Sequence, residues 1–414
     1  MSLFKNQKYD RVLLLAVLAL VLIGVVMITS IGVPKSIRLS APDLAYGNCA
    51  DAAVDCYLIL KKHVVRAALG LVAMLIAWKM PYKAWKTLAP LFYIAGVALL
   101  VYVLAAGDEN GTFAKSWINL PALPFIDSVQ PSEIAKLGLI FYLSYFLSEK
   151  ISYEKLQDFK EGFLKFALIA GLIIGLIVSQ PDVGSAIILA AIAGVIYYIA
   201  GANIKHIAVV LGIGAFFALI AFSTQDHIQT RVQAFFQPVS ECDGEDYCWQ
   251  TKQANIAIGS GGFWGKGLTQ GIQKSFWLPQ AVDDFIFAAT AEELGFVRMS
   301  LIVLLYATIA YRGFQIASHA PNKFSMLLAT GISTWITIQA FVNIMVNTAL
   351  FPITGITLPF MSYGGSSMVM TLFAIGVLLN ISQSYAKNEY SADRRRYGRA
   401  RYTQPRYSGR YSRL

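Results

Sequence analysis

Two adjacent carboxylates, Asp283 and Asp284, lie in a polar, glycine-rich stretch (residues 253–293) that connects two long apolar segments. Acidic residues at the edge of a membrane are costly to keep there, so we take a functional role as the default explanation. Neighbouring carboxylates repel each other, which raises at least one pKa. The pair is therefore a candidate for a tuned base or for a site that recruits a divalent cation.

A structural explanation of the pair stays open. Both acids follow Pro279 at the expected start of a helix, where acidic side chains stabilise the helix dipole by ~0.3–1 kcal/mol. The same stretch carries Lys266 and Lys274, which are candidates to bind phosphate. As loop residues, they could instead be solvated or face lipid headgroups.

A second polar motif begins at Lys115 and Trp117 and continues through Gln130, Glu133 and Lys136. The proline after Gln130 favours a helix start, and a spacing of three places Glu133 and Lys136 on one helix face. Substrate binding and phosphate recognition are one interpretation. An ordinary helix cap with an internal ion pair is the other, and for Trp117 an interfacial position is typical.

Two further motifs complete the set of candidate binding residues. Gln180 and Asp182 lie in a tight connection between two apolar segments, where a simple turn is the alternative. The sequence TGITLPFMSYGGSS begins at Thr354 and leads into the last apolar segment. It could offer bare amides and hydroxyls to an anion. Its candidate residues are Ser362, Gly364, Gly365 and Ser366.

These motifs must be positioned by helices that cross a membrane. Of the 414 residues, 56% are hydrophobic and only 14% are charged, which excludes an ordinary soluble domain. The composition predicts an all-α integral membrane protein with about ten transmembrane helices. The apolar segments fall at roughly 12–31, 63–78, 87–105, 133–148, 162–178, 183–200, 206–223, 285–311, 325–346 and 366–382.

The basic residues predict the orientation of these spans. The first segment, Val12–Ile31, is too long for a signal peptide and lacks a cleavage site, so it is predicted to remain as the first span. Lysines and arginines follow the even-numbered segments, which places both termini in the cytoplasm and the polar motifs outside. A large extracytoplasmic loop then connects helices 7 and 8.

All four cysteines lie in the loops predicted to face outward, an oxidising compartment. No histidine lies at ligand spacing from them, which disfavours a metal site. We expect two local disulfides, Cys49–Cys56 and Cys242–Cys248.

The chain is predicted to divide into a membrane domain, residues 1–386, and a cytoplasmic tail, residues 387–414. The tail carries nine basic and two acidic residues and no apolar periodicity, which predicts disorder. Its charge favours contact with anionic membrane lipid, and docking of cytoplasmic proteins is an alternative. We expect no nucleic-acid partner.

The motifs together resemble those of one family. The segments QPSEIAKL, QPDVGSA, IAIGSGG, DFIFA, EELG and TGITLPFMSYGGSS occur in the order and topology of the SEDS (shape, elongation, division and sporulation) proteins, the integral-membrane peptidoglycan glycosyltransferases. The resemblance covers nearly the whole chain apart from its ends. The SYGGSS motif is more similar to the division branch (FtsW-like) than to the elongation branch (RodA-like).

The resemblance implies polymerisation of lipid II, a disaccharide peptide on undecaprenyl pyrophosphate, at the outer face of the bacterial plasma membrane during septal wall synthesis. The family's catalytic aspartate precedes FIFA, which implies that Asp284 is the general base for the acceptor hydroxyl. Basic residues and amides would stabilise the departing pyrophosphate. Implied partners are a class B penicillin-binding transpeptidase (FtsI-like) and other divisome proteins, with no certain cofactor.

The sequence departs from the family pattern at two positions. Asp283 stands where the family usually has Thr or Ser, so either acid of the pair could act. Ser116 stands where the family often has Arg, which puts phosphate recognition there in doubt. Three alternatives remain open: RodA-like elongation, a flippase for lipid II, and a non-catalytic scaffold for the transpeptidase. Polar motifs gathered on one side favour an enzyme over a flippase.

Overall fold

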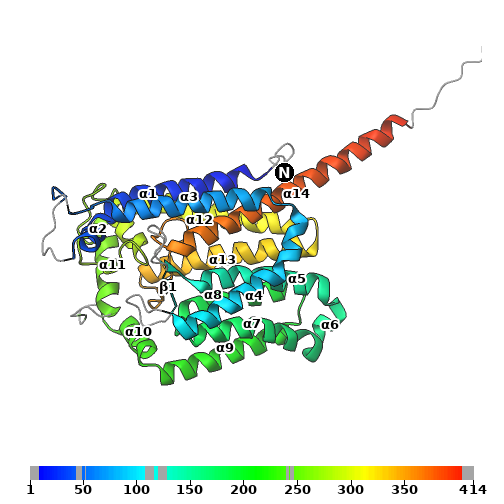
Figure 1. The fold of residues 1–414 in the computed structure, drawn as a ribbon, viewed down its shortest axis with the longest axis horizontal. Helices are drawn as coiled ribbons and strands as arrows, with labels where there is room; N and C mark the ends of the chain where they lie inside the picture. Colours follow the sequence, from blue (N-terminus) through cyan, green and yellow to red (C-terminus); the bar gives the residue numbers. More distant parts are fainter. Residues whose placement is uncertain are drawn as a thin grey trace, which may run out of the picture.

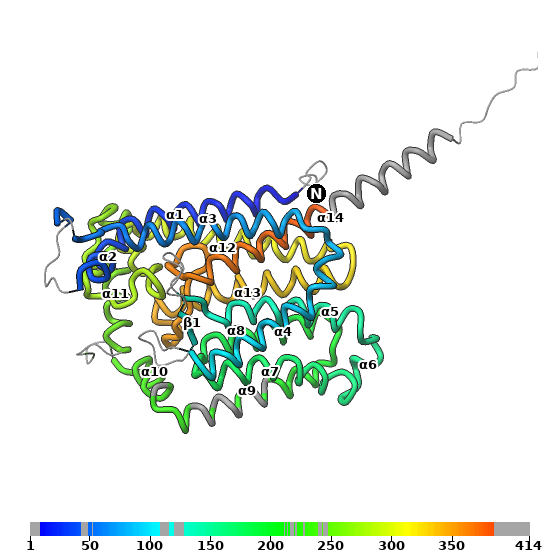
Figure 2. Tube along the Cα trace, viewed as in Figure 1, coloured from blue at the N-terminus to red at the C-terminus, as the bar shows by residue number. Residues whose placement is uncertain are grey.

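The computed structural model describes residues 9–42, 49–51, 53–107, 116–119, 128–238, 242 and 247–402, and Figure 2 traces the chain. The described chain is almost entirely helical. Two π-helical segments, Phe146–Lys150 and Phe159–Leu164, extend α5 and precede α7. The α-helices are α1 (Arg11–Ile31), α2 (Val33–Ser40), α3 (Leu58–Lys79), α4 (Tyr82–Ala106), α5 (Pro131–Tyr145), α6 (Tyr153–Gln157), α7 (Lys165–Val178), α8 (Val183–Ile199), α9 (Ile204–Thr224), α10 (Asp226–Phe236), α11 (Tyr247–Gly261), α12 (Ile286–Ser318), α13 (Lys323–Asn347) and α14 (Gly365–Tyr402).

Each of the ten apolar segments coincides with a long helix, and these helices lie roughly parallel in one bundle (Figure 1). Among the described residues, six helices are long and apolar enough to cross a membrane. Many of their apolar side chains are exposed, as lipid-facing residues of a membrane protein are. The six are Arg11–Ile31, Tyr82–Ala106, Phe159–Val178, Ile286–Ser318, Lys323–Asn347 and Gly365–Ser384.

The helix starts have local causes that the sequence carries. Asp10 caps α1 by accepting a hydrogen bond from the Leu13 amide at 2.9 Å. Asp182 caps α8 in the same way, and Pro131 occupies the first position of α5, where a missing amide hydrogen costs nothing. Asp182, a candidate binding residue, thus also sets where α8 begins.

Close packing of α3 against α14 depends on two glycines. A Cβ added at Gly70 would lie 2.6 Å from the Leu372 side chain, and one added at Gly376 would lie 2.3 Å from the Met74 carbonyl oxygen. Small residues allow helix backbones to approach closely inside a membrane, where packing rather than hydrophobicity holds helices together. This contact brings the start of α14 beside α3.

Helix α12 is broken near one end, which the apolar pattern does not predict. Gly295 has φ 75° and ψ 174°, a conformation that only glycine adopts readily. The amides of Lys266 and Gly267 donate to the carbonyls of Glu292 and Glu293, two acids in the first half of α12. The preceding loop therefore takes over hydrogen bonds that a continuous helix would make internally.

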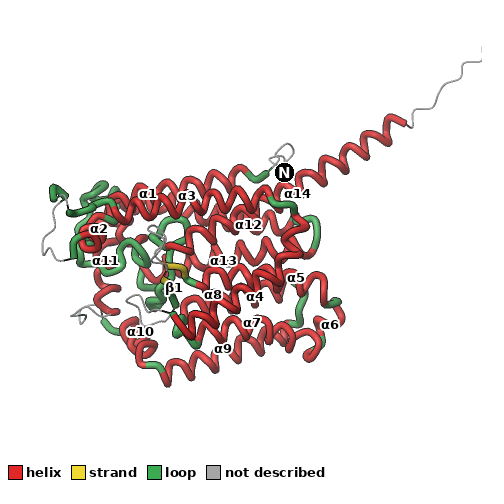
Figure 3. Tube along the Cα trace, in the orientation of Figure 1, coloured by secondary structure: helices red, strands yellow, loops and turns green. Residues whose placement is uncertain are grey.

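Most of the non-helical chain gathers at one end of the bundle, around α2, α10 and α11 (Figure 3). A short antiparallel pair lies there, β1 (Ile118–Asn119) with β2 (Ser128–Val129). The structure forms both expected disulfides at this end, Cys49–Cys56 and Cys242–Cys248. The opposite end of the bundle carries α6 and the connection between α12 and α13 (Figure 1).

The predicted boundary at residue 387 falls within α14, which runs from Gly365 to Tyr402. Residues 403–414 lie outside the described part of the chain, so the disorder of the tail stays a prediction.

Candidate active site

The loop that carries Asp283 and Asp284 is fixed through its backbone. The Tyr363 amide donates to the Val282 carbonyl at 2.9 Å, and the Ser362 hydroxyl donates to the Asp283 carbonyl at 2.7 Å. Every one of these bonds uses main-chain atoms of the acidic loop. The motif that begins at Thr354 therefore holds the loop, and Ser362 acts on its backbone rather than on an external group.

Two asparagines of α13 complete this support from the other side. The Nδ2 groups of Asn343 and Asn347 donate to the Asp284 carbonyl at 2.8 and 2.9 Å. Both asparagines are buried, and they lie four residues apart on one face of the helix. Because the backbone of Asp284 is held on two sides, its side chain has a defined position while its carboxylate stays unused by the support.

The two acids differ in what their carboxylates contact. Oδ2 of Asp283 forms an ion pair with Nζ of Lys35, which α2 supplies. Within the described chain, no hydrogen bond or ion pair engages the carboxylate of Asp284. The structure thus separates the pair into a neutralised acid and an available one.

Burial raises the pKa of the Asp284 carboxyl to about 7, and the charge of Asp283 adds to the rise, while Lys35 and Arg231 act against it. Burial likewise raises the pKa of Asp283, and there the ammonium group of Lys35 is the main opposing influence. A carboxylate with a pKa near neutrality is suited to accept a proton from a hydroxyl group.

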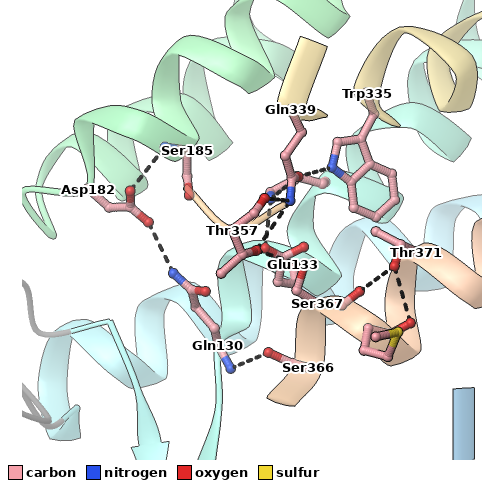
Figure 4. Close-up of polar contacts among 12 residues, drawn as sticks. Gln130, Glu133, Asp182, Ser185, Trp335, Gln339, Thr357, Ser366, Ser367 and Thr371 are labelled. Carbon is pink, nitrogen blue, oxygen red and sulfur yellow. Dashed lines mark hydrogen bonds and ion pairs between the residues drawn. The ribbon is translucent and has the colours of Figure 1, made fainter. Parts of the chain in front are cut away.

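A network of polar side chains joins the helix starts next to the acidic loop (Figure 4). Gln130 donates its backbone amide to Oγ of Ser366 at 3.1 Å and its side-chain amide to Oδ2 of Asp182 at 3.3 Å. Thr357 accepts from Gln339 and donates to Ser367 at 3.3 Å. Three predicted motifs, distant in sequence, therefore meet at one place.

The meeting of helix starts has an electrostatic consequence. The N-terminal ends of α5, α8, α12 and α14 all lie in this region, and each carries a partial positive charge. Lys35 and Arg66 add full charges, with the Arg66 guanidinium 4.5 Å and the Lys35 ammonium 5.6 Å from the centre of the Tyr363 ring. Gly365 lies beside Arg66, since a Cβ added to it would be 3.5 Å from Cζ of Arg66 and 3.3 Å from the Ser128 carbonyl oxygen. The arrangement favours an anionic ligand.

Glu133 and Lys136 form the internal ion pair that was one of their two predicted roles. Their charged atoms are 2.8 Å apart, and only 5% and 2% of the side chains are exposed. Nζ of Lys136 also donates to Gln339 at 3.2 Å, and one oxygen of Glu133 has no partner in the described structure. In this state Lys136 is therefore engaged by the protein.

Lys266 and Lys274 bind glutamates instead of facing the acidic loop. Nζ of Lys266 lies 2.7 Å from Glu292, and Nζ of Lys274 lies 2.7 Å from Glu293. Arg298, which is close to both glutamates in sequence, donates instead to main-chain oxygens. Both lysines thus hold the loop against α12, which leaves them poorly placed for the phosphate role predicted for them.

The remaining predicted residues divide into three groups. Gln180 is buried and donates to the Leu100 carbonyl at 3.0 Å, which ties the turn to α4. Trp117 precedes β1 and is partly exposed, and the Gly364 amide donates within its own turn to the Ser362 carbonyl. Lys115 lies outside the described residues.

Sequence reasoning missed several residues that shape the site. Arg66 and the two asparagines are polar residues inside apolar segments, a signal of function that was available. Lys35 carried no such signal, because it lies 248 residues from Asp283. Within the described chain, no three His, Cys, Asp or Glu side chains gather as metal ligands, and Lys35 already holds Asp283.

Fold and site together define a multi-pass, helical membrane protein with an available carboxylate and a positive surround at one end of its bundle. Comparison with known proteins gives the family. Residues 10–387 match the family model FtsW/RodA/SpoVE, described as cell cycle protein. The chain belongs to this family, which comprises the SEDS proteins.

Comparisons with individual relatives agree with this family assignment. The chain is 35% identical over 383 residues to a Trichlorobacter lovleyi protein named probable peptidoglycan glycosyltransferase FtsW, covering 92% of this chain and 94% of the relative. A solved structure described as "Structural coordination of polymerization and crosslinking by a peptidoglycan synthase complex" has 25% identity and a TM-score of 0.70, covering 91% of this chain and 98% of that chain. The crystal structure of the rod shape determining protein RodA from Thermus thermophilus has 27% identity and a TM-score of 0.62, covering 91% and 97%.

Proposed function

We propose that this protein is a peptidoglycan glycosyltransferase that polymerises lipid II during septal wall synthesis, with Asp284 as its general base. The observation that carries the proposal is the free carboxylate of Asp284, held by its backbone among four helix N-termini. The family supports the reaction class, and the FtsW name of the relative supports the division role. Elongation is the second candidate, since a solved RodA shares the fold.

In the proposed reaction, the Asp284 carboxylate accepts the proton of the 4-hydroxyl of an incoming lipid II. The hydroxyl oxygen attacks the anomeric carbon of the growing chain, and the bond from that carbon to undecaprenyl pyrophosphate breaks. The departing pyrophosphate gains negative charge, which the helix N-termini with Arg66 stabilise. Asp284 then releases its proton to solvent and is ready for the next addition.

The membrane arrangement is part of the proposal. We place ten spans across the plasma membrane, with both termini in the cytoplasm and the acidic loop outside. Both disulfides lie at the same end as the acidic loop, as expected for an oxidising compartment. The lipid portion of the substrate would then stay in the bilayer while its sugars reach Asp284. A class B transpeptidase is the proposed partner, in line with the synthase complex that shares the fold.

The test is polymerisation of purified lipid II by this protein with its cognate transpeptidase, whose active-site serine is blocked. We expect glycan strands from the wild type and from Asp283→Ala, and none from Asp284→Ala. Loss in both variants would mean that the acids act as a unit. Normal strands from Asp284→Ala would refute the mechanism, and a folded but inactive wild type would favour the flippase or scaffold.

A further inference from the structure

The contact between Lys35 and Asp283 joins the acidic loop to a distant short helix. Lys35 belongs to α2, and its ammonium group pairs with Oδ2 of Asp283. The exposed fractions of the two side chains are 35% and 18%, so the pair is partly shielded from water. An ion pair in such a place is screened less than one on the surface.

The helix that carries Lys35 is firmly placed. The Ser36 hydroxyl donates to the Gly32 carbonyl at 2.7 Å and accepts from the Ile59 amide at 3.1 Å, which ties α2 to the start of α3. Farther along α2, Ser40 accepts from the Asp55 amide at 3.0 Å, beside Cys56 of the first disulfide. Lys35 is therefore delivered to Asp283 by a rigid element rather than by a long free side chain.

Without Lys35, two neighbouring carboxylates would share one enclosed site. Like charges at this spacing cannot both ionise easily, so a proton would be retained by the pair near neutral pH. A base that retains its proton cannot accept another from a substrate. The charged groups that bear on Asp284 come from several elements: Lys35 of α2, Asp182 before α8, Arg231 of α10 and the adjacent Asp283. Arg66 of α3 bears on Asp283.

We propose that Lys35 is a positioning residue for the reaction: it holds the Asp283 carboxylate and neutralises its charge, so that Asp284 alone serves as the base. This inference rests on the proposed function, because it assigns a role in the same proton transfer. Lys35 acts through Asp283 and is not required to touch the substrate. Its importance should therefore depend on the presence of a carboxylate at position 283.

The experiment is a double-variant cycle of lipid II polymerisation, with rates measured from pH 5.5 to 9. The variants are Lys35→Met, which keeps the length of the side chain, Asp283→Asn, which keeps the shape of the acid, and the two combined. For Lys35→Met we expect the midpoint of the rate-against-pH curve to move upward by about one unit or more. For Asp283→Asn with Lys35→Met we expect the same curve as for Asp283→Asn alone.

Lys35→Arg supplies the matched control, since it retains the charge, and it should restore most of the wild-type curve. A merely structural ion pair would lower the yield of folded protein without moving the midpoint, and that result would overturn the proposal. The proposal would also be overturned if Lys35→Met moved the midpoint equally far in the Asp283→Asn background and in the wild type. Should Lys35→Met alone fail to fold, the comparison of Asp283→Asn with the combined variant decides by the same criterion.

Failure of the proposed function can be distinguished from failure of the inference about Lys35. A wild type without polymerase activity would count against the proposed function, and the pair would then be followed by the pH dependence of thermal unfolding. Protonation of Asp284 contributes to that dependence whether or not the protein is an enzyme. The same upward shift in Lys35→Met, cancelled by Asp283→Asn, would still support the role of Lys35, and its absence would refute it.

Discussion

Two pairs of adjacent acids lie within eleven residues of each other, Asp283–Asp284 and Glu292–Glu293, and their surroundings are opposite. Both glutamates are fully buried, and each accepts bonds from a lysine and from loop amides. Of the two aspartates, Asp283 pairs its carboxylate with a lysine, whereas the carboxylate of Asp284 has no bonded partner in the described structure. A buried acid with all its bonds satisfied maintains the fold, whereas an acid left available can do chemistry.

The largest expected effect separates activity from stability at Asp284. Asp284→Asn should lower the rate of lipid II polymerisation by about 10²–10⁴-fold, the range in which general bases contribute. The same change should raise the melting temperature at pH 8, because it removes an enclosed charge that has no partner. Polymerisation assays and thermal unfolding in detergent would measure the two effects. A lower melting temperature would contradict the contrast between the two acidic pairs.

The opposite result is expected for the glutamates. Glu293→Gln leaves the Lys274 ammonium, which is 9% exposed, without its counter-charge. Breaking a buried ion pair in this way costs about 3–5 kcal/mol. Thermal unfolding should show a lower melting temperature, and adding Lys274→Met should recover part of the loss. If the single variant were as stable as the wild type, the pair would not be structural.

The pH dependence should sharpen the contrast, because Asp284 has a pKa of about 7 in the folded protein against an ordinary value of 3.8. Between these values the folded state binds the extra proton, so stability should fall as pH rises from about 4 to about 7. The polymerisation rate should rise as the pH passes through about 7, since only the ionised base accepts a proton. One unit below the pKa, we expect about a tenth of the maximal rate. Asp284→Asn should flatten the Asp284 part of the stability curve, and an unchanged curve would contradict the assignment.

A smaller effect should come from the disulfide next to α2. Cys49→Ser with Cys56→Ser removes the link that closes the first loop, while Lys35 itself is unchanged. We expect a few-fold lower polymerisation rate and a modest loss of stability, about 2–4 kcal/mol at most. The matched control is Cys242→Ser with Cys248→Ser, in a loop that does not carry Lys35. Equal losses from both pairs would show that α2 has no special role.

The smallest effect is expected at Arg298. Within the described part of the chain, its guanidinium bonds only to main-chain oxygens of Trp264 and Leu294, and the residue is exposed. Arg298→Ala should change the stability by less than about 0.5 kcal/mol, as surface substitutions usually do. A loss as large as that of Glu293→Gln would mean that the glutamates depend on Arg298 after all.

Much of this architecture could be predicted from the sequence. Each apolar segment coincides with a helix, and six helices of the described chain are long and apolar enough to cross a membrane. Pro131 located the start of α5. The break at Gly295 could not be predicted in this way, because its cause is the approach of a loop to the backbone of α12. Periodicity records which faces are apolar but not which carbonyls a neighbouring segment will bind.

The candidate site shows the same division. Motif order indicated that Gln130, Asp182 and Ser366 would share one region, and the network in Figure 4 joins them. The partners of Lys266 and Lys274 were not predicted, because a charge in a loop gives no indication of which opposite charge it will meet. Lys35 was hidden for a similar reason, since its role depends on the full folding of the chain.

The separations of these ion pairs along the chain bear on biogenesis. Lys266 and Lys274 lie 26 and 19 residues from their glutamates, so a nascent chain can neutralise both acids as soon as α12 leaves the ribosome. Lys35 lies 248 residues from Asp283, and closing so long a loop requires the intervening helices to be in the bilayer first. The two glutamates are therefore neutralised early, when α12 enters the bilayer. The end of the bundle that carries Asp284 reaches its final structure only when the last helices have assembled.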